Sequence, residues 1–100
     1  MQPKRSVVRK AGARSRKLER VVKGFANHRR IEILELLKHK PELSVGEISL
    51  ALEIELKTAS EHLRRLTLSG LILKRHAGRE VRHVLTSRAQ KTLTFLRILE

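Results

Sequence analysis

The segment from Ser44 to Thr86 constrains the fold most, because two helical patterns with a very short connection are followed directly by two extended patterns. The first helix opens with a capping box, in which Ser44 caps the helix and Glu47 reaches back from three residues further on. Only a tight turn fits between Leu52, where this pattern ends, and Leu56, where the next begins. Two helices with so short a connection are typical of the helix-turn-helix arrangement.

Apolar residues at helical spacing predict one buried face for each of these two helices. The residues expected to point inward are Val45, Ile48, Ala51 and Leu52 in the helix over 44–52, and Leu56, Ala59, Leu63 and Leu66 in the helix over 56–69. Gly70 follows at the position of a left-handed C-terminal cap. Residues 71–76 and 80–86 alternate with a period of two, and the glycine in the intervening Ala77-Gly78-Arg79 predicts a hairpin turn.

Three further helices complete the expected fold. The first helix is predicted over residues 14–25, and the second over residues 28–39 with Asn27 as its N-terminal cap. Ser87 and Gln90 predict a capping box for a last helix that runs to about residue 99. The sequence therefore predicts a mainly α protein of about five helices with a small two-stranded β-hairpin, which is a winged helix-turn-helix fold.

The charge of the chain indicates a polyanionic partner. Lys and Arg number 23 against 10 acidic residues, all of them Glu, which gives a formal charge of +13. Seven of these basic residues and no acid lie within residues 1–17, where no periodic apolar positions occur. We therefore expect residues 1–13 to form a basic flexible arm and residues 14–100 to form one folded domain. The absence of cysteine excludes disulfides and thiolate metal sites.

The stretch from Phe25 to Thr86 resembles the arsenic-resistance repressor (ArsR-type) branch of winged-helix transcriptional regulators. The matching segments are residues 27–37 for the second helix, 42–48 for the third, 58–66 for the recognition helix, 69–72 for the junction and 75–86 for the wing. The resemblance implies a fold that binds duplex DNA through the recognition helix and the wing. It also agrees with a dimer that is formed by the first and last helices.

Two departures from this family bear on metal binding. Metal-sensing members carry cysteines where this chain has Ser44 and Gly46, and another metal site in such proteins uses Asp and His on the last helix, which residues 87–100 lack. No pair among the five histidines shows tight ligand spacing with a second acid or thiol. We expect no metal and no cofactor. The chain also has no Asp, no strained nucleophile turn and no Gly-rich phosphate loop, so we expect it not to be an enzyme.

The candidate DNA-binding residues lie on the outward face of the recognition helix and on the wing, which the helical period of 100° per residue and the hairpin register define. They are Lys57, Thr58, Ser60, Glu61, Arg64 and Arg65 from the helix, and Lys74, Arg75, Arg79 and Arg82 from the wing. In a major groove, Lys or Arg can reach guanine and Glu can accept from cytosine, while Arg79 can enter a minor groove. The alternatives are a solvated face on which Glu61 pairs with the arginines, and a strand edge that positive charge protects from aggregation.

The candidate dimer interface consists of apolar residues near the two chain ends, for which an ordinary core is the alternative. They are Leu18, Val21, Val22, Phe25, Leu93, Phe95, Leu96 and Leu99. Together these features predict a cytoplasmic, nucleoid-associated homodimer that binds palindromic double-stranded DNA sequence-specifically and represses transcription. A non-specific architectural or chromatin protein is an alternative that the charge favours. An RNA-binding winged helix is disfavoured because the only aromatic residues are two Phe, too few for base stacking.

Overall fold

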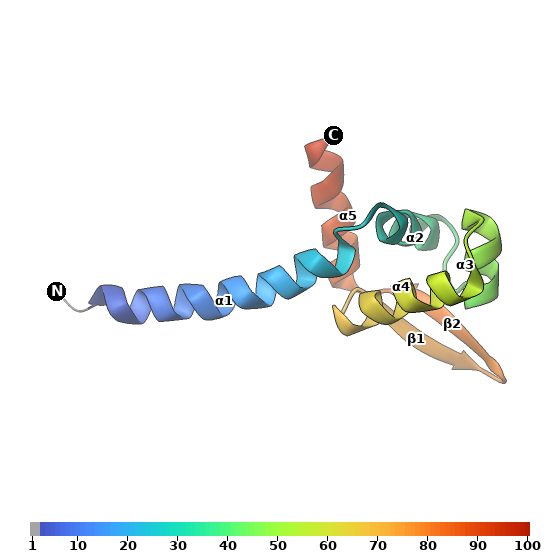
Figure 1. The fold of residues 1–100 in the computed structure, drawn as a ribbon, viewed down its shortest axis with the longest axis horizontal. Coiled ribbons are helices and arrows are strands. Elements are labelled where there is room, and N and C mark those ends of the chain that lie inside the picture. Colours follow the sequence, from blue (N-terminus) through green and yellow to red (C-terminus); the bar gives the residue numbers. More distant parts are fainter. Residues whose placement is uncertain (1–2) are drawn as a thin grey trace.

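The computed structural model describes the backbone of residues 3–100 and the side chains of residues 11–100. Its elements follow the order α1 (Pro3–Phe25), α2 (His28–His39), α3 (Val45–Leu52), α4 (Leu56–Leu68), β1 (Ile72–Ala77), β2 (Glu80–Leu85) and α5 (Ser87–Leu99). Five helices and a two-stranded antiparallel hairpin confirm the expected winged helix-turn-helix fold (Figure 1).

The core lies around α2, which contacts α1, α3, α4, α5 and β2. Ile33, Leu34 and Leu37 of this helix are fully enclosed. Helix α4 contributes Ala59, Leu63 and Leu66 to the same core, as the period of its apolar residues predicts. Burial of this face fixes the rotation of α4 about its axis, so its polar residues face outward.

The first helix begins much earlier than its apolar pattern predicts. Helix α1 starts at Pro3 instead of Arg14, so residues 3–13, expected to be a flexible arm, are helical. Proline is well tolerated in the first turn of a helix, and Ala, Arg and Lys, which dominate this stretch, are good helix formers. Apolar periodicity does not indicate this start, because this half of α1 projects away from the rest of the molecule (Figure 1). Residues 1 and 2 of the expected arm lie outside the described residues.

The caps that start the helices agree with the sequence in two cases of three. Asn27 accepts hydrogen bonds from the backbone N–H groups of Arg29 and Arg30. Ser44 and Glu47 form the expected capping box. Helix α5, however, is capped by Thr86, whose side chain accepts from the N–H of Ala89, and not by the expected Ser87–Gln90 box.

Two residues expected to point inward lie outside the core. Leu56 is 57% exposed although it lies on the same face of α4 as Ala59, because it is the first residue of the helix and precedes the first core residue. Ala51 on α3 is also exposed, so the buried face of that short helix is narrower than its sequence predicts.

The wing is a hairpin with a two-residue loop. Ala77 pairs with Glu80, and Gly78, at the first loop position, has φ 64°, which a glycine adopts without steric cost. A bridge between Leu43 and His83, which the sequence did not predict, adds a third short segment beside β2. The buried His83 ring also contacts the Leu43 carbonyl through Nδ1 at 2.9 Å. These contacts join the base of the wing to the segment that precedes α3.

Candidate nucleic-acid interface

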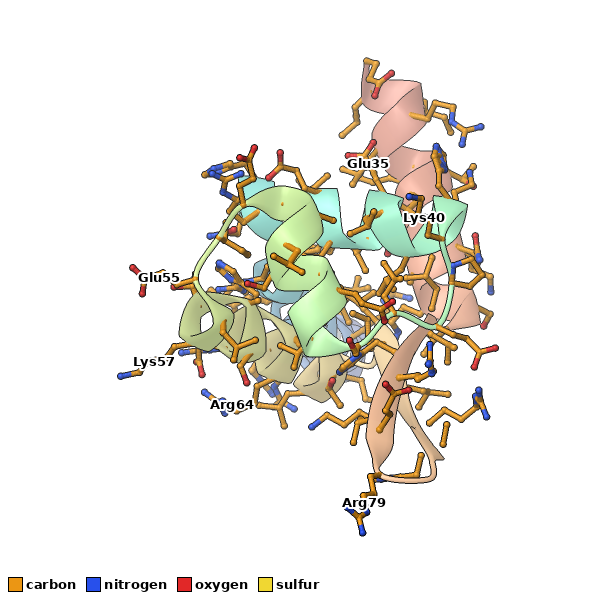
Figure 2. The ribbon with its side chains drawn as sticks, turned by 90° about the vertical axis from the view of Figure 1, so that its right-hand side faces the viewer. Glu35, Lys40, Glu55, Lys57, Arg64 and Arg79 are labelled. Atoms are coloured by element: carbon orange, nitrogen blue, oxygen red, sulfur yellow. The ribbon has the colours of Figure 1, made fainter. Side chains whose placement is uncertain are left out.

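Helix α4 and the wing present basic side chains on the same side of the molecule. Figure 2 shows Lys57, Arg64 and Arg79 on the lower side, whereas Glu35 and Lys40 lie on the opposite side near α5. All six candidate residues of α4 are exposed. The structure thus brings the helix and the wing tip together as one basic surface.

Three of the candidate lysines and arginines on α4 and the wing have no acidic partner among the described side chains. In the part of the chain whose side chains are described, Lys57, Lys74 and Arg79 form no ion pair with an acidic residue. Arg79 lies at the tip of the wing, at the lower end of the view in Figure 2. These side chains can therefore contact phosphates or bases without losing an internal partner.

The two other wing arginines, Arg75 and Arg82, lie opposite each other on β1 and β2 and are both bound to acidic partners. Arg75 is paired with the Glu42 carboxylate. Arg82 donates to the Glu42 carbonyl oxygen at 2.9 Å and also pairs with Glu80. Arg82 is only half-buried, and its contacts hold β2 against the segment before α3. The contacts of Arg75 and Arg82 favour a role in fixing the wing, in addition to any contact with DNA.

On the outer face of α4, Glu61 binds both arginines of the helix. Arg64 donates to the two carboxylate oxygens at 3.0 and 2.8 Å, and Arg65 donates at 3.2 Å. These hydrogen bonds lower the pKa of the Glu61 carboxyl to about 2. The pairing that the sequence left as an alternative is therefore present in the free protein.

A contact that the sequence does not reveal joins α1, α2 and α4. The Arg30 guanidinium donates to the His62 ring nitrogen Nδ1 at 3.2 Å and to the carbonyls of Lys23 and Gly24 at 3.1 Å. Burial of the His62 ring and the nearby Arg30 charge lower the pKa of this histidine. Arg30 thus ties the end of α1 to the recognition helix, and no local sequence signal could have identified partners 32 residues apart.

The candidate dimer residues divide into two groups. Phe25 and Leu93 are only 8% and 6% exposed and belong to the core of one protomer, so they are not available as surface. Leu18, Val22, Phe95 and Leu99 are largely exposed, and Val21 and Leu96 pack partly against the core. The unexpected burial of Phe25 and Leu93 follows from the packing of α1 and α5 against the same core.

The exposed apolar residues border a groove between α1, the end of α4 and the start of α5. The groove has a volume of about 930 Å³, and Leu18, Val22 and Phe95 are among its apolar lining residues. Basic side chains also line it, namely Arg14, Lys17, Arg20, Arg88 and Lys91. Apolar surface of this kind is typical of an interaction site.

Two other kinds of feature are absent from the described residues. Among residues 3–100, no helix is long and apolar enough to cross a membrane. Within the same described part of the chain, no group of three or more His, Cys, Asp or Glu side chains could hold a metal ion.

Comparison with known proteins places the chain among transcriptional regulators. Residues 25–75 match the model of a helix-turn-helix domain family. The transcriptional activator HlyU of Vibrio cholerae is 38% identical over 73 residues, which are 73% of this chain and 67% of that protein.

Solved structures agree with this assignment. A homodimeric winged helix-turn-helix DNA-binding domain from Mycobacterium bovis, a possible ArsR-family transcriptional regulator, is 29% identical with a TM-score of 0.80, covering 88% of this chain and 82% of that one. Reduced HlyU from Vibrio cholerae is 33% identical with a TM-score of 0.78, covering 90% and 95%. The chain therefore belongs to the ArsR-type family of winged helix-turn-helix transcriptional regulators.

Proposed function

We propose that this regulator binds double-stranded DNA sequence-specifically as a homodimer on a palindromic operator and represses transcription there. The observation that carries the proposal is the single basic surface formed by α4 and the wing tip, with Lys57 and Arg79 free of internal partners among the described side chains (Figure 2). A major groove admits a helix of this kind, and Lys and Arg side chains there can donate to guanine.

Phosphate contacts would supply much of the affinity. Cations on α4, on the wing and along α1 release condensed counterions when they bind a duplex, so the logarithm of the binding constant should fall steeply with the logarithm of the salt concentration. Arg79 would reach the minor groove beside the major groove that α4 occupies. Such a protein would act on the nucleoid in the cytoplasm.

The dimer is supported by the exposed apolar groove between α1 and α5. The related Mycobacterium bovis domain is homodimeric. Two-fold symmetry would place two copies of α4 in successive major grooves about 34 Å apart. A dimer that spans two grooves would exclude other proteins from that duplex, which is the physical basis for repression.

Competition binding tests the nucleic-acid class. A labelled DNA duplex bound to the full chain is titrated with unlabelled duplex DNA or with duplex RNA of equal length and charge. We expect DNA to compete much more effectively, because the deep, narrow major groove of A-form RNA does not admit α4. Equal competition would contradict the proposal and favour an RNA-binding winged helix.

Transcription in vitro from a promoter that contains the preferred duplex tests the direction of regulation. We expect added protein to lower the amount of transcript. A rise in transcript would show that this protein activates, as the name of the related HlyU states for that protein.

A further inference from the structure

Glu61 is the only acidic residue within α4, and both of its carboxylate oxygens are engaged by arginines of the same helix. Arg64 binds it through two nitrogen atoms, which is the bidentate geometry that gives arginine–carboxylate pairs their directional strength. Arg65 shares one of the same oxygens. Two of the arginines on the DNA-facing side are therefore held by one carboxylate.

The stability of α4 does not depend on this cluster. All three side chains are about half exposed, and exposed pairs at this helical spacing contribute little to folding. Helix α4 is fixed by the burial of Ala59, Leu63 and Leu66 instead. A role in recognition accounts better for a carboxylate placed in the middle of an otherwise basic surface.

The carboxylate of Glu61 cancels the charge of one arginine, so the cluster of Glu61, Arg64 and Arg65 carries the net charge of a single arginine. Glu61 is ionised at neutral pH, as an exposed carboxylate is, and the hydrogen bonds from Arg64 and Arg65 lower its pKa further, to about 2. Glu61 engages only some of the N–H groups of Arg64 and Arg65, so a duplex that offers only phosphates can bind the remaining ones in the orientation that Glu61 imposes, or must break the bonds to Glu61. The duplex must also accept a carboxylate near its own negative charge, which is unfavourable.

A duplex with suitable bases can satisfy the whole cluster. The amino group of cytosine donates a hydrogen bond in the major groove, and guanine accepts two from arginine. When Glu61 accepts from a cytosine and Arg64 donates to a neighbouring guanine, each side chain gains a base as a partner in place of the one that it gives up. Only such a sequence replaces the internal bonds of the cluster.

We propose that Glu61 determines specificity by restraining Arg64 and Arg65, so that α4 binds poorly to arbitrary duplexes and well to a site that presents cytosine to its carboxylate. This inference rests on the proposed binding of duplex DNA. Glu61 would then lower the affinity for arbitrary duplexes, whereas the basic residues of the same surface raise that affinity.

The test compares three variants that each remove one negative charge. In Glu61→Gln the arginines are released. Glu55→Gln neutralises the residue that immediately precedes α4, and the side chain of Glu55 makes no cap hydrogen bond. In Glu35→Gln, the change lies on the side of the molecule away from α4 (Figure 2). Affinity is measured over a range of salt for a duplex selected from a random pool and for a scrambled duplex of the same composition.

We expect Glu61→Gln to bind the scrambled duplex about tenfold more tightly and to lose about tenfold or more of the ratio between the two duplexes. Its salt slope for the scrambled duplex should steepen by about one or two, since each added phosphate contact contributes about 0.9. The preference for cytosine at the position facing Glu61 should disappear. The Glu55→Gln and Glu35→Gln variants should change the ratio by less than about twofold, because they release no arginine.

The outcomes separate this inference from the proposed function. If the wild type prefers the selected duplex but Glu61→Gln alters the ratio no more than Glu55→Gln does, the restraint by Glu61 is refuted while sequence-specific binding stands. If the wild type binds selected and scrambled duplexes equally, both proposals are wrong. Thermal unfolding of each variant, expected near that of the wild type because the sites are exposed, shows that binding is compared between folded proteins.

Discussion

At the scale of single residues, the basic surface contains side chains that differ in what they must give up to bind DNA. Lys57 and Arg79 have no acidic partner among the described side chains, whereas Arg64, Arg65, Arg75 and Arg82 each do. Free cations gain a phosphate or base contact without an internal loss. We therefore expect the effects of substitution to depend on position along the surface as well as on charge.

Lys57 and Arg79 should differ in the kind of binding they support. Arg79→Ala should weaken binding to selected and scrambled duplexes by similar factors and reduce the salt slope by about one, because a wing-tip cation contacts the backbone or the minor groove. Lys57→Ala should instead lose about 1–3 kcal/mol of preference for the selected duplex, as a lost base contact does. Binding isotherms of both variants on both duplexes provide the measurement. Equal losses on the two duplexes for Lys57→Ala would show that this residue does not read bases.

His62 should make stability depend on pH. Burial and the Arg30 charge lower its pKa in the folded protein, so the unfolded chain binds a proton more readily. The stabilisation by the neutral ring is therefore complete above the ordinary histidine pKa of about 6.5 and is lost as the pH falls below it. Urea unfolding at about pH 7.5 and about pH 5 should show a larger decrease for the wild type than for His62→Gln, which cannot titrate. Parallel decreases for the two proteins would contradict this role.

At the scale of secondary-structure elements, most of the fold could be predicted because each element carries its own signal. The apolar period of α2 and α4, the capping box at Ser44 and the glycine in the hairpin all lie within a few residues of the element they define. The missed features depend on contacts across the chain, such as the bridge between Leu43 and His83. For the same reason the sequence could place Glu61 next to its arginines, which are three and four residues away, but not Arg30 next to His62.

The start of α5 offers a direct test of one corrected element. Thr86 accepts from the Ala89 N–H and donates to the Gly70 carbonyl at 2.7 Å, whereas Ser87 is exposed. Thr86→Ala should cost about 1–2 kcal/mol of unfolding free energy, since it removes the cap and leaves a backbone carbonyl without its partner. Ser87→Ala should stay within about 0.5 kcal/mol of the wild type. Equal losses of unfolding free energy in the two variants would contradict Thr86 as the cap and support Ser87 in its place.

At the scale of the whole molecule, the exposed apolar groove and the basic surface of α4 and the wing tip belong to different regions. The groove lies between α1 and α5, and Arg30 connects the end of α1 to α4. A second copy of the chain bound against α1 and α5 would therefore set the spacing between the two copies of α4, because these elements are already packed together within each protomer. On the proposed function, this arrangement would let a small domain read a long DNA site.

Two leucines provide a matched test of the dimer. Leu18 lines the groove and is 57% exposed, whereas Leu50 on α3 is 81% exposed and lies outside it. Leu18→Glu should raise the dimer dissociation constant by about tenfold or more, because it buries a charge in an apolar contact. Leu50→Glu should leave sedimentation unchanged. A wild-type protein that sediments as a monomer at all concentrations, or equal behaviour of both variants, would contradict the proposed interface.

Selection of bound duplexes from a random pool by the full chain tests the central claim most directly. We predict enrichment of a two-fold symmetric motif whose half-sites are centred about one helical turn, or 34–36 Å, apart. Such a motif would mean that two copies of α4 read bases in successive major grooves. Recovery of duplexes without any common motif would contradict sequence-specific binding and favour a non-specific architectural protein.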